Sequence, residues 1–220
     1  MKKLSFVMAI LITVILSGKL IFAQEDVALP DSAGPGIQPS AVSKVPEPSQ
    51  TGVVAPSSST PLVATAKIFS TTDPEVVLGE ITFTQIEGSG VMVTGVIKNV
   101  SPGKHGLHVH DKGSCDEMGN AAGGHFNPHL SSHGFLPRDG QAKAHSGDMG
   151  NIEISETGEG IITLLMPNVY LKGEDNNFVG RAVILHEKED DFGQPTGNAG
   201  GRIGCGTIEL MPIPGQEITK

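Results

Sequence analysis

The amino-acid sequence predicts an all-β fold, an antiparallel sandwich or barrel of about eight short strands. β-branched residues gather in short runs that Gly, Asn, Asp or Pro separate, which is typical of strands and turns. Several runs alternate in polarity, as in Ile81-Thr82-Phe83-Thr84, which is the period of a half-buried strand. The chain also has 29 Gly among 220 residues, a content that favours many turns.

The first 63 residues lack this pattern. Residues 1–23 begin with Lys2 and Lys3, continue through an apolar run and end at Ala23, which is typical of a secretory signal peptide. The run is shorter than the roughly 20 apolar residues of a membrane span, so an uncleaved anchor is the less favoured alternative. Residues 24–63 hold 7 of the 15 Pro and no aromatic residue. We expect a disordered tether there, either a specific spacer or a plain leader.

The β domain is expected at residues 64–213, followed by a tail at 214–220. Its predicted strands span residues 66–70, 80–85, 91–100, 152–155, 160–165, 179–186 and 202–210, with one more strand through His108 and His110. Two stretches, 111–150 and 187–201, are too long for ordinary turns. Long loops in compact domains are often functional, so we expect the site there.

Charge narrows the class of partner. The chain carries 24 Asp and Glu against 15 Lys and Arg, a formal net charge of −9 at pH 7. The charges of residues 1–63 cancel, so the whole acidic excess lies on residues 64–220. Nucleic acid is therefore excluded as a general partner, because neutralising phosphates requires clustered Lys and Arg.

The histidines form a constellation typical of metal binding. All 8 lie between His105 and His186. Residues two apart on a strand share a face, so His108 and His110 present two imidazoles side by side. The other candidate ligands are His125, His129, His133, His145, Asp148 and His186. This set exceeds the needs of one tetrahedral ion, and all-nitrogen ligation suits copper or zinc, so two ions are the economical interpretation.

Five motifs together resemble the copper/zinc superoxide dismutases, over about residues 65–211. They are Gly103-x-His105-Gly106-x-His108-Val109-His110, Gly123-Gly124-His125-Phe126-Asn127-Pro128, His145-x-Gly147-Asp148, His186-Glu187-Lys188 and Gly197-Asn198-Ala199-Gly200-Gly201-Arg202-x-x-Cys205-Gly206. The resemblance implies an eight-stranded antiparallel Greek-key β-sandwich or barrel whose two long loops form the active site. A zinc hydrolase fits poorly, because the segment after His186 lacks the second His of the metalloprotease helix.

The resemblance also implies the ligands of a copper ion and a zinc ion. Carried over to this sequence, they are His108, His110, His125 and His186 for copper, and His125, His133, His145 and Asp148 for zinc. His125 would bridge the two ions, and in the family mechanism it takes up a proton and returns it. The implied reaction converts superoxide to dioxygen and hydrogen peroxide, with copper supplying the redox change and zinc a structural role.

Residues beside the ligands follow from the same resemblance. Asp190 matches the carboxylate that links a copper histidine, His108 or His110, to the zinc ligand His133. His105 matches a buried histidine behind the site, which we interpret as structural.

His129 has no counterpart among the family ligands, so we expect it on the surface or beside the site. Arg202 matches the family arginine, whose guanidinium offers charge and paired donors to a small anion. We therefore expect Arg202 to bind superoxide.

Substrate guidance is where this sequence departs from many relatives. The stretch at residues 192–196, before the Gly-Asn-Ala-Gly motif, is short and has no Lys or Arg. A negatively charged protein must then attract an anion locally, through the metal ions and Arg202. Lys188, Arg138 and Lys143 are candidate helpers.

The chain's 2 Cys, Cys115 and Cys205, match the intrachain disulfide of the family. An exported chain with two Cys favours a disulfide over two free thiols. The bond would tie the first long loop to the Arg202 segment. Cys115 follows His110 closely, a spacing that resembles secreted bacterial members.

The signal pattern and the resemblance together imply an extracytoplasmic enzyme, periplasmic or secreted, that removes external superoxide. Its expected partner is the superoxide anion. The family includes monomers and homodimers, so both stay open here, and membrane association is expected only if the signal segment is retained. A copper or zinc carrier on the same fold is the rival hypothesis, but the chain keeps every ligand and Arg202.

Overall fold

The computed structural model describes residues 61–173 and 175–212. The predicted signal peptide, nearly all of the predicted tether and the C-terminal tail lie outside these residues. Within them, no helix has the length and apolar character needed to cross a membrane.

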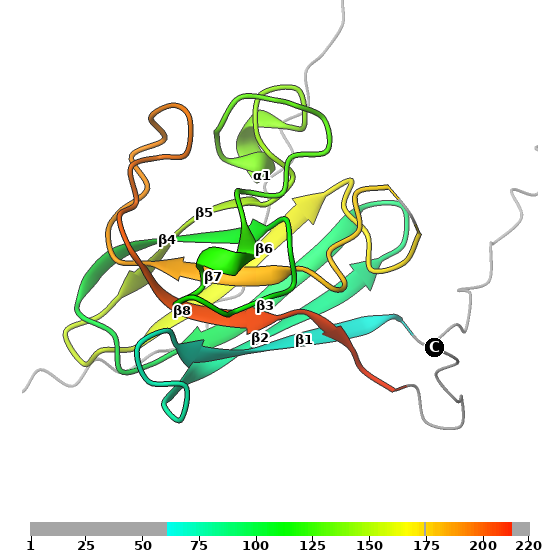
Figure 1. Ribbon diagram of the computed structural model, residues 1–220. Helices are drawn as coiled ribbons and strands as arrows, with labels where there is room; N and C mark the ends of the chain where they lie inside the picture. The colour runs from blue at the N-terminus through cyan, green and yellow to red at the C-terminus, as the bar shows by residue number, and fades with distance from the viewer. Residues whose placement is uncertain (1–60, 174, 213–220) are drawn as a thin grey trace, which may run out of the picture. The chain divides into compact units, whose positions relative to one another are not determined.

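The described residues form an almost purely β structure, as predicted (Figure 1). The strands are β1 (Val63–Ser70), β2 (Val77–Ile86), β3 (Gly90–Ile97), β4 (Gly103–His110), β5 (Asp148–Ile154), β6 (Gly160–Pro167), β7 (Ala182–His186), β8 (Arg202–Thr207) and β9 (Glu209–Leu210). Two short helices, η1 (Asn120–Ala122) and α1 (Leu136–Asp139), lie in the first long loop.

The strands pair in the order β5-β4-β7-β8-β1-β2-β3-β6, all antiparallel, and β9 pairs with β1. The chain crosses between distant strands from β3 to β4 and from β6 to β7, which gives the expected Greek-key barrel. The terminal strands β5 and β6 pack side by side and nearly close it. The two long loops lie on the outside of the barrel, over β4 and β7 (Figure 1).

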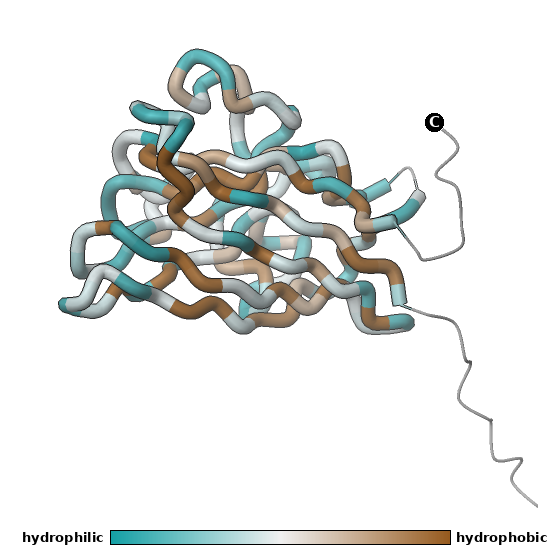
Figure 2. The backbone as a smooth tube through the Cα atoms, turned by 90° about the horizontal axis from the view of Figure 1, so that it is seen from below, coloured by the Kyte–Doolittle hydropathy of each residue, from teal (hydrophilic) through white to brown (hydrophobic). Residues whose placement is uncertain are grey.

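The core follows from the alternation of apolar and polar residues, visible along the strands in Figure 2. On β4, Leu107 and Val109 belong to the apolar core, while His108 and His110 project from the opposite face. These histidines are nevertheless buried, with 0% and 1% of their surface exposed. The long loops therefore cover this outer face, and the buried polar residues gather beneath them.

Several predicted strand ends need correction. The predicted strand 91–100 ends at Ile97, because Asn99 takes a left-handed φ of 59° that a strand does not accommodate. The predicted strand 179–186 begins only at Ala182, after Gly180 turns the chain with a φ of 80°. The predicted strand 202–210 is two strands, since Thr207 pairs with β7 and Glu209 with β1.

Candidate metal centre

Strand pairing places four of the predicted site residues. β4 pairs with β5 so that His108 lies opposite Asp148, which was expected in a loop but begins β5. β7 pairs with β8 so that His186 lies opposite Arg202. Strand pairing therefore brings together His108 and Asp148, which are 40 residues apart in the chain, and His186 and Arg202, which are 16 apart. Because β4 also pairs with β7, the outer face of these adjacent strands becomes one site.

The first long loop adds His125 through a backbone ladder. His125 forms an isolated bridge with His110, and the N–H of Phe126 donates to the carbonyl of Val109. Gly147 completes the ladder, donating to Phe126 and accepting from Val109. A Cβ on Gly147 would lie 2.0 Å from the carbonyl oxygen of Val109, so only glycine fits there.

The predicted ligands gather into two groups that share His125. His108, His110, His125 and His186 form the first group, and His125, His133, His145 and Asp148 form the second. All seven residues are buried, and within each group the candidate ligand atoms lie within 4.8 Å of one another. This is the juxtaposition that the sequence predicted.

The first group fits a metal that prefers nitrogen ligands. Nδ1 of His108, Nε2 of His110 and Nε2 of His186 are buried without a hydrogen-bond partner. Unpartnered buried polar atoms are rare in native proteins and call for an explanation such as a missing ion. The opposite nitrogens are engaged: Nε2 of His108 with Asp190 at 2.8 Å, and Nδ1 of His110 with the carbonyl of Gly123 at 2.9 Å. Each ring thus directs its free nitrogen toward the group.

The second group surrounds the carboxylate of Asp148. Its Oδ1 lies 2.8 Å from Nδ1 of His125 and 3.2 Å from Nδ1 of His145. Nδ1 of His133 lies 3.0 Å from Oδ2 but makes no hydrogen bond with it. The N–H groups of Gly134 and His145 donate to Oδ2 and fix the carboxylate. Three imidazoles and one carboxylate are a donor set that zinc accepts.

Burial and neighbouring charges set the protonation of both groups. Burial lowers the pKa of His125 to about 4 and that of His186 to about 3, so these rings are neutral at pH 7. Burial also lowers the pKa of His133, but the carboxylates of Asp148 and Asp190 outweigh it and raise the value to about 9. Burial would raise the pKa of Asp148, but the three histidines hold it far below its usual range.

Asp190 links the two groups. Its Oδ2 accepts from Nε2 of His108 at 2.8 Å, and its Oδ1 lies 3.0 Å from Nε2 of His133. The structure thus selects His108 rather than His110 as the histidine that Asp190 links to His133. Asp190 is fully buried, and the N–H of Phe192 and the side chain of Asn151 hold it in place.

The remaining two histidines differ in environment. His105 is buried, with its ring nitrogens 2.9 Å from the carbonyl oxygens of Ser101 and His186. It lies behind the site and belongs to neither group. His129 is exposed on the surface of the first long loop and is also outside both groups.

A cleft of about 210 Å³ opens onto the first group. It is lined by His110, Gly124, His125, His186, Thr196, Asn198, Ala199, Gly200 and Arg202. Arg202 is half-buried and donates to the carbonyls of Gly119 and Gly123, both at 2.6 Å. Burial lowers its pKa, yet a guanidinium stays charged at neutral pH. The cleft therefore combines ligand imidazoles with a fixed positive charge.

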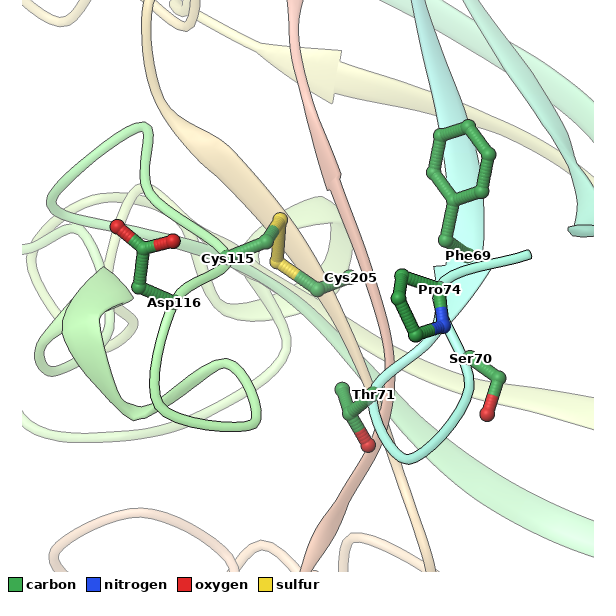
Figure 3. A pocket seen from close by; sticks show the side chains of 7 residues that line it. All are labelled: Phe69, Ser70, Thr71, Pro74, Cys115, Asp116 and Cys205. Atoms are coloured by element: carbon green, nitrogen blue, oxygen red, sulfur yellow. A yellow bond between two sulfur atoms is a disulfide. The ribbon is translucent and has the colours of Figure 1, made fainter. Parts of the chain in front are cut away.

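The predicted disulfide between Cys115 and Cys205 is present. It joins the first long loop to β8, three residues after Arg202 (Figure 3). The carbonyls that hold Arg202 belong to the same loop. Figure 3 shows the bond beside a pocket whose other wall is Phe69 and Pro74, so one side of the disulfide is open to solvent.

Sequence reasoning missed two residues that contact the second group. Gln194 hydrogen-bonds the backbone of His133, and the ring of Phe192 stacks on its imidazole. Both lie in the short stretch at residues 192–196, whose sequence predicts only an absence of positive charge. Both residues closely follow Asp190 in the chain, which is the one signal that they lie near the site. The directions of their side chains cannot be predicted, because an irregular loop has no periodicity.

Comparisons with known proteins agree with this geometry. The family model described as copper/zinc superoxide dismutase matches residues 77–208. An extracellular superoxide dismutase [Cu-Zn] of Caenorhabditis elegans is 41% identical over 142 residues, which cover 61% of this chain and 62% of the relative, less than two thirds of its length. Superoxide dismutase [Cu-Zn] 5 of Dictyostelium discoideum is 41% identical over 143 residues, covering 61% of this chain and 91% of that protein.

A solved structure, that of the clock protein EA4, is 40% identical with a TM-score of 0.61, covering 70% of this chain and 97% of that one.

The fold and the paired ligand groups define a β-barrel metalloenzyme with a two-metal site. The chain belongs to the copper/zinc superoxide dismutase family. As a member it is an oxidoreductase whose cofactors are a copper ion and a zinc ion.

Proposed function

We propose that the cleft beside His125 is where this domain converts superoxide to dioxygen and hydrogen peroxide. The observation that carries the proposal is the set of buried, unpartnered imidazole nitrogens that converge beside a fixed guanidinium. A small anion is the substrate that suits a cleft of about 210 Å³ with Arg202 on its wall.

The free nitrogens support a ligand assignment for each ion. Because Nδ1 of His125 faces Asp148, its Nε2 is left for the first group. Copper would be held by His108, His110, His125 and His186, and zinc by His125, His133, His145 and Asp148, with the free nitrogens of His108, His110, His133 and His186 available as ligand atoms.

Copper, when bound, supplies one-electron redox chemistry, and zinc a fixed positive charge. Two superoxide ions and two protons give one dioxygen and one hydrogen peroxide, so the site must hold and return protons. We assign this role to Nε2 of His125, the nitrogen left free by the contact of Nδ1 with Asp148, which can carry a proton whenever it is not bound to the metal ion. Arg202 attracts and orients each anion in turn through its charge.

Asp190 and His105 orient the ligands without touching the substrate. Asp190 accepts from His108 and contacts His133, which fixes both rings and makes them better ligands. His105 fixes the backbone carbonyl of His186 from behind.

The place of action follows from the N-terminal pattern and from relatives named extracellular in Caenorhabditis elegans and Haemonchus contortus. We propose export, into a periplasm or the medium, where the enzyme removes external superoxide. A homodimer and attachment through residues 1–23 are the further associations that the sequence allows. The native mass of the mature protein distinguishes a monomer from a homodimer, and its N-terminal sequence together with membrane fractionation shows whether residues 1–23 attach it.

The test is superoxide decay measured with the metal-loaded full chain, with His125→Ala and Arg202→Ala as variants. We expect His125→Ala to lose activity together with its normal metal content, and Arg202→Ala to keep both metals and lose most of the rate. A wild-type protein that binds both metals but does not dismutate superoxide would overturn the enzyme hypothesis and favour the metal-carrier hypothesis.

A further inference from the structure

The second long loop holds His133 from three sides within five residues of sequence. Asp190 contacts its Nε2, Phe192 lies against its ring, and Gln194 binds its backbone. His133 itself comes from the first long loop, so these contacts join the two loops across the site. Only the Asp190 contact has a role in the proposed function.

Gln194 pairs with the peptide of His133 in both directions. The N–H of His133 donates to Oε1 at 3.0 Å, and Nε2 donates to the carbonyl of His133 at 2.8 Å. Two bonds to the same residue fix both the position and the orientation of its backbone. His133 lies in an irregular stretch without strand neighbours. The two hydrogen bonds from Gln194 therefore hold its backbone in place, as the hydrogen bonds between strands hold the backbone of His108.

Phe192 covers the ring of His133. The two rings lie at an angle of 21° with centroids 6.4 Å apart. Phe192 has a φ of 59°, a conformation that bulky residues rarely adopt, and its N–H donates to Oδ1 of Asp190 at 2.8 Å. The guanidinium of Arg138 lies 5.3 Å from its ring centroid. Backbone strain of this kind persists only where surrounding contacts require it, and here they surround His133.

We propose that Gln194 and Phe192 are positioning residues that hold the zinc ligand His133 in place. This rests on the proposed function, in which His133 binds zinc. Partners that orient a metal ligand typically contribute about 10- to 100-fold in metal affinity. Because Thr196 and Asn198 in the cleft wall lie only two and four residues after Gln194, the same short loop sets both zinc retention and the shape of the cleft.

The experiment measures zinc release from the metal-loaded full chain to a chromophoric chelator, and the visible spectrum of Co²⁺ placed in the zinc site. The variants are Gln194→Met, which removes both amide groups, and Phe192→Leu, which keeps apolar cover but loses the ring. Gln85→Met is the matched control, because Gln85 also pairs with backbone in both directions, to Gly90 at 2.9 Å and from Leu171 at 2.8 Å, in the barrel.

We expect zinc release to be about 10-fold faster or more in Gln194→Met and a few-fold faster in Phe192→Leu, with an altered Co²⁺ spectrum in both. Gln85→Met should lower the melting temperature but release zinc at the wild-type rate. Wild-type release in Gln194→Met, or equal acceleration in Gln85→Met, would overturn the positioning role. A wild-type chain that takes up neither Zn²⁺ nor Co²⁺ would instead overturn the zinc assignment, and this inference with it.

Discussion

Arg202 and His110 donate hydrogen bonds to one carbonyl oxygen, that of Gly123, at 2.6 and 2.9 Å. The shared acceptor fixes the guanidinium relative to an imidazole that we assign to copper. The distance between the Arg202 guanidinium and the His110 imidazole is therefore set by the backbone of the first long loop rather than by a side chain.

Arg202→Lys should therefore lower the rate of superoxide decay even though it keeps the positive charge. Arg202 uses two separate guanidinium nitrogens for Gly119 and Gly123, and a lysine offers only one nitrogen on a flexible stem, so we expect its ammonium to be less well fixed over the cleft. Losing one preorganised electrostatic group costs about 100- to 1000-fold in other enzymes, and we expect a loss at or below the lower end of that range, because the charge is kept. Pulse radiolysis measures the rate. Wild-type activity in this variant would show that charge alone suffices.

Lys188 is the basic residue expected to guide superoxide. It is exposed, and its side chain packs at Gly200 on the cleft wall, 3.1 Å from where a Cβ would lie. Arg138, another candidate, is instead paired with Asp139 at 2.7 Å. Lys188→Gln should reduce the rate about two- to three-fold at low ionic strength, and the difference should vanish at high salt, because screening removes steering. A wild-type rate that does not change with salt would eliminate steering altogether.

Zinc binding by the metal-free protein should release a proton at pH 7. The pKa of His133 is about 9, so its ring is protonated and zinc must displace that proton. Zinc affinity should therefore rise with pH up to about 9 and then level off. The raised pKa of His133 also affects folding. Protonation of His133 stabilises the metal-free fold fully at pH values below 6.5, the ordinary pKa of histidine, and this contribution is lost as the pH rises through about 9.

Titration calorimetry in two buffers with different ionisation enthalpies measures the released proton. Copper is the internal control, since His125 and His186, with pKa values of about 4 and 3, are already neutral at pH 7. Equal heats for zinc in both buffers would contradict the raised pKa of His133.

Gly197→Ala should weaken the link between the two ligand groups. A Cβ there would lie 1.9 Å from Oδ1 of Asp190 and 2.7 Å from Nε2 of His133, at a φ of +79°. We expect a loss of about 1 to 3 kcal/mol in stability and faster zinc release. Gly88→Ala separates the causes, because its φ is +72° but nothing lies within 4 Å. If the two variants lose stability equally and both retain zinc, backbone strain alone explains the effect.

The sequence predicted the barrel and the histidine groups because both depend on short-range rules and on distinctive motifs. Alternation marks strands such as β2, and two-residue spacing places His108 and His110 on one face. The start of β5 was missed because Asp148, Met149 and Gly150 are all buried, which hides the alternation. The contacts of Phe192 and Gln194 depend on how two irregular loops meet, and no local pattern encodes that meeting.

The contacts of Phe192 and Gln194 with His133 matter for protein engineering. Loop exchange between relatives is an obvious way to give this enzyme the longer, basic guiding segment that many of them carry. Here the replaced stretch would include Phe192 and Gln194, so a graft aimed at faster substrate capture would also change how long zinc stays bound. Additions should therefore be made after Gln194, and any gain in rate judged only alongside the metal content of the grafted protein.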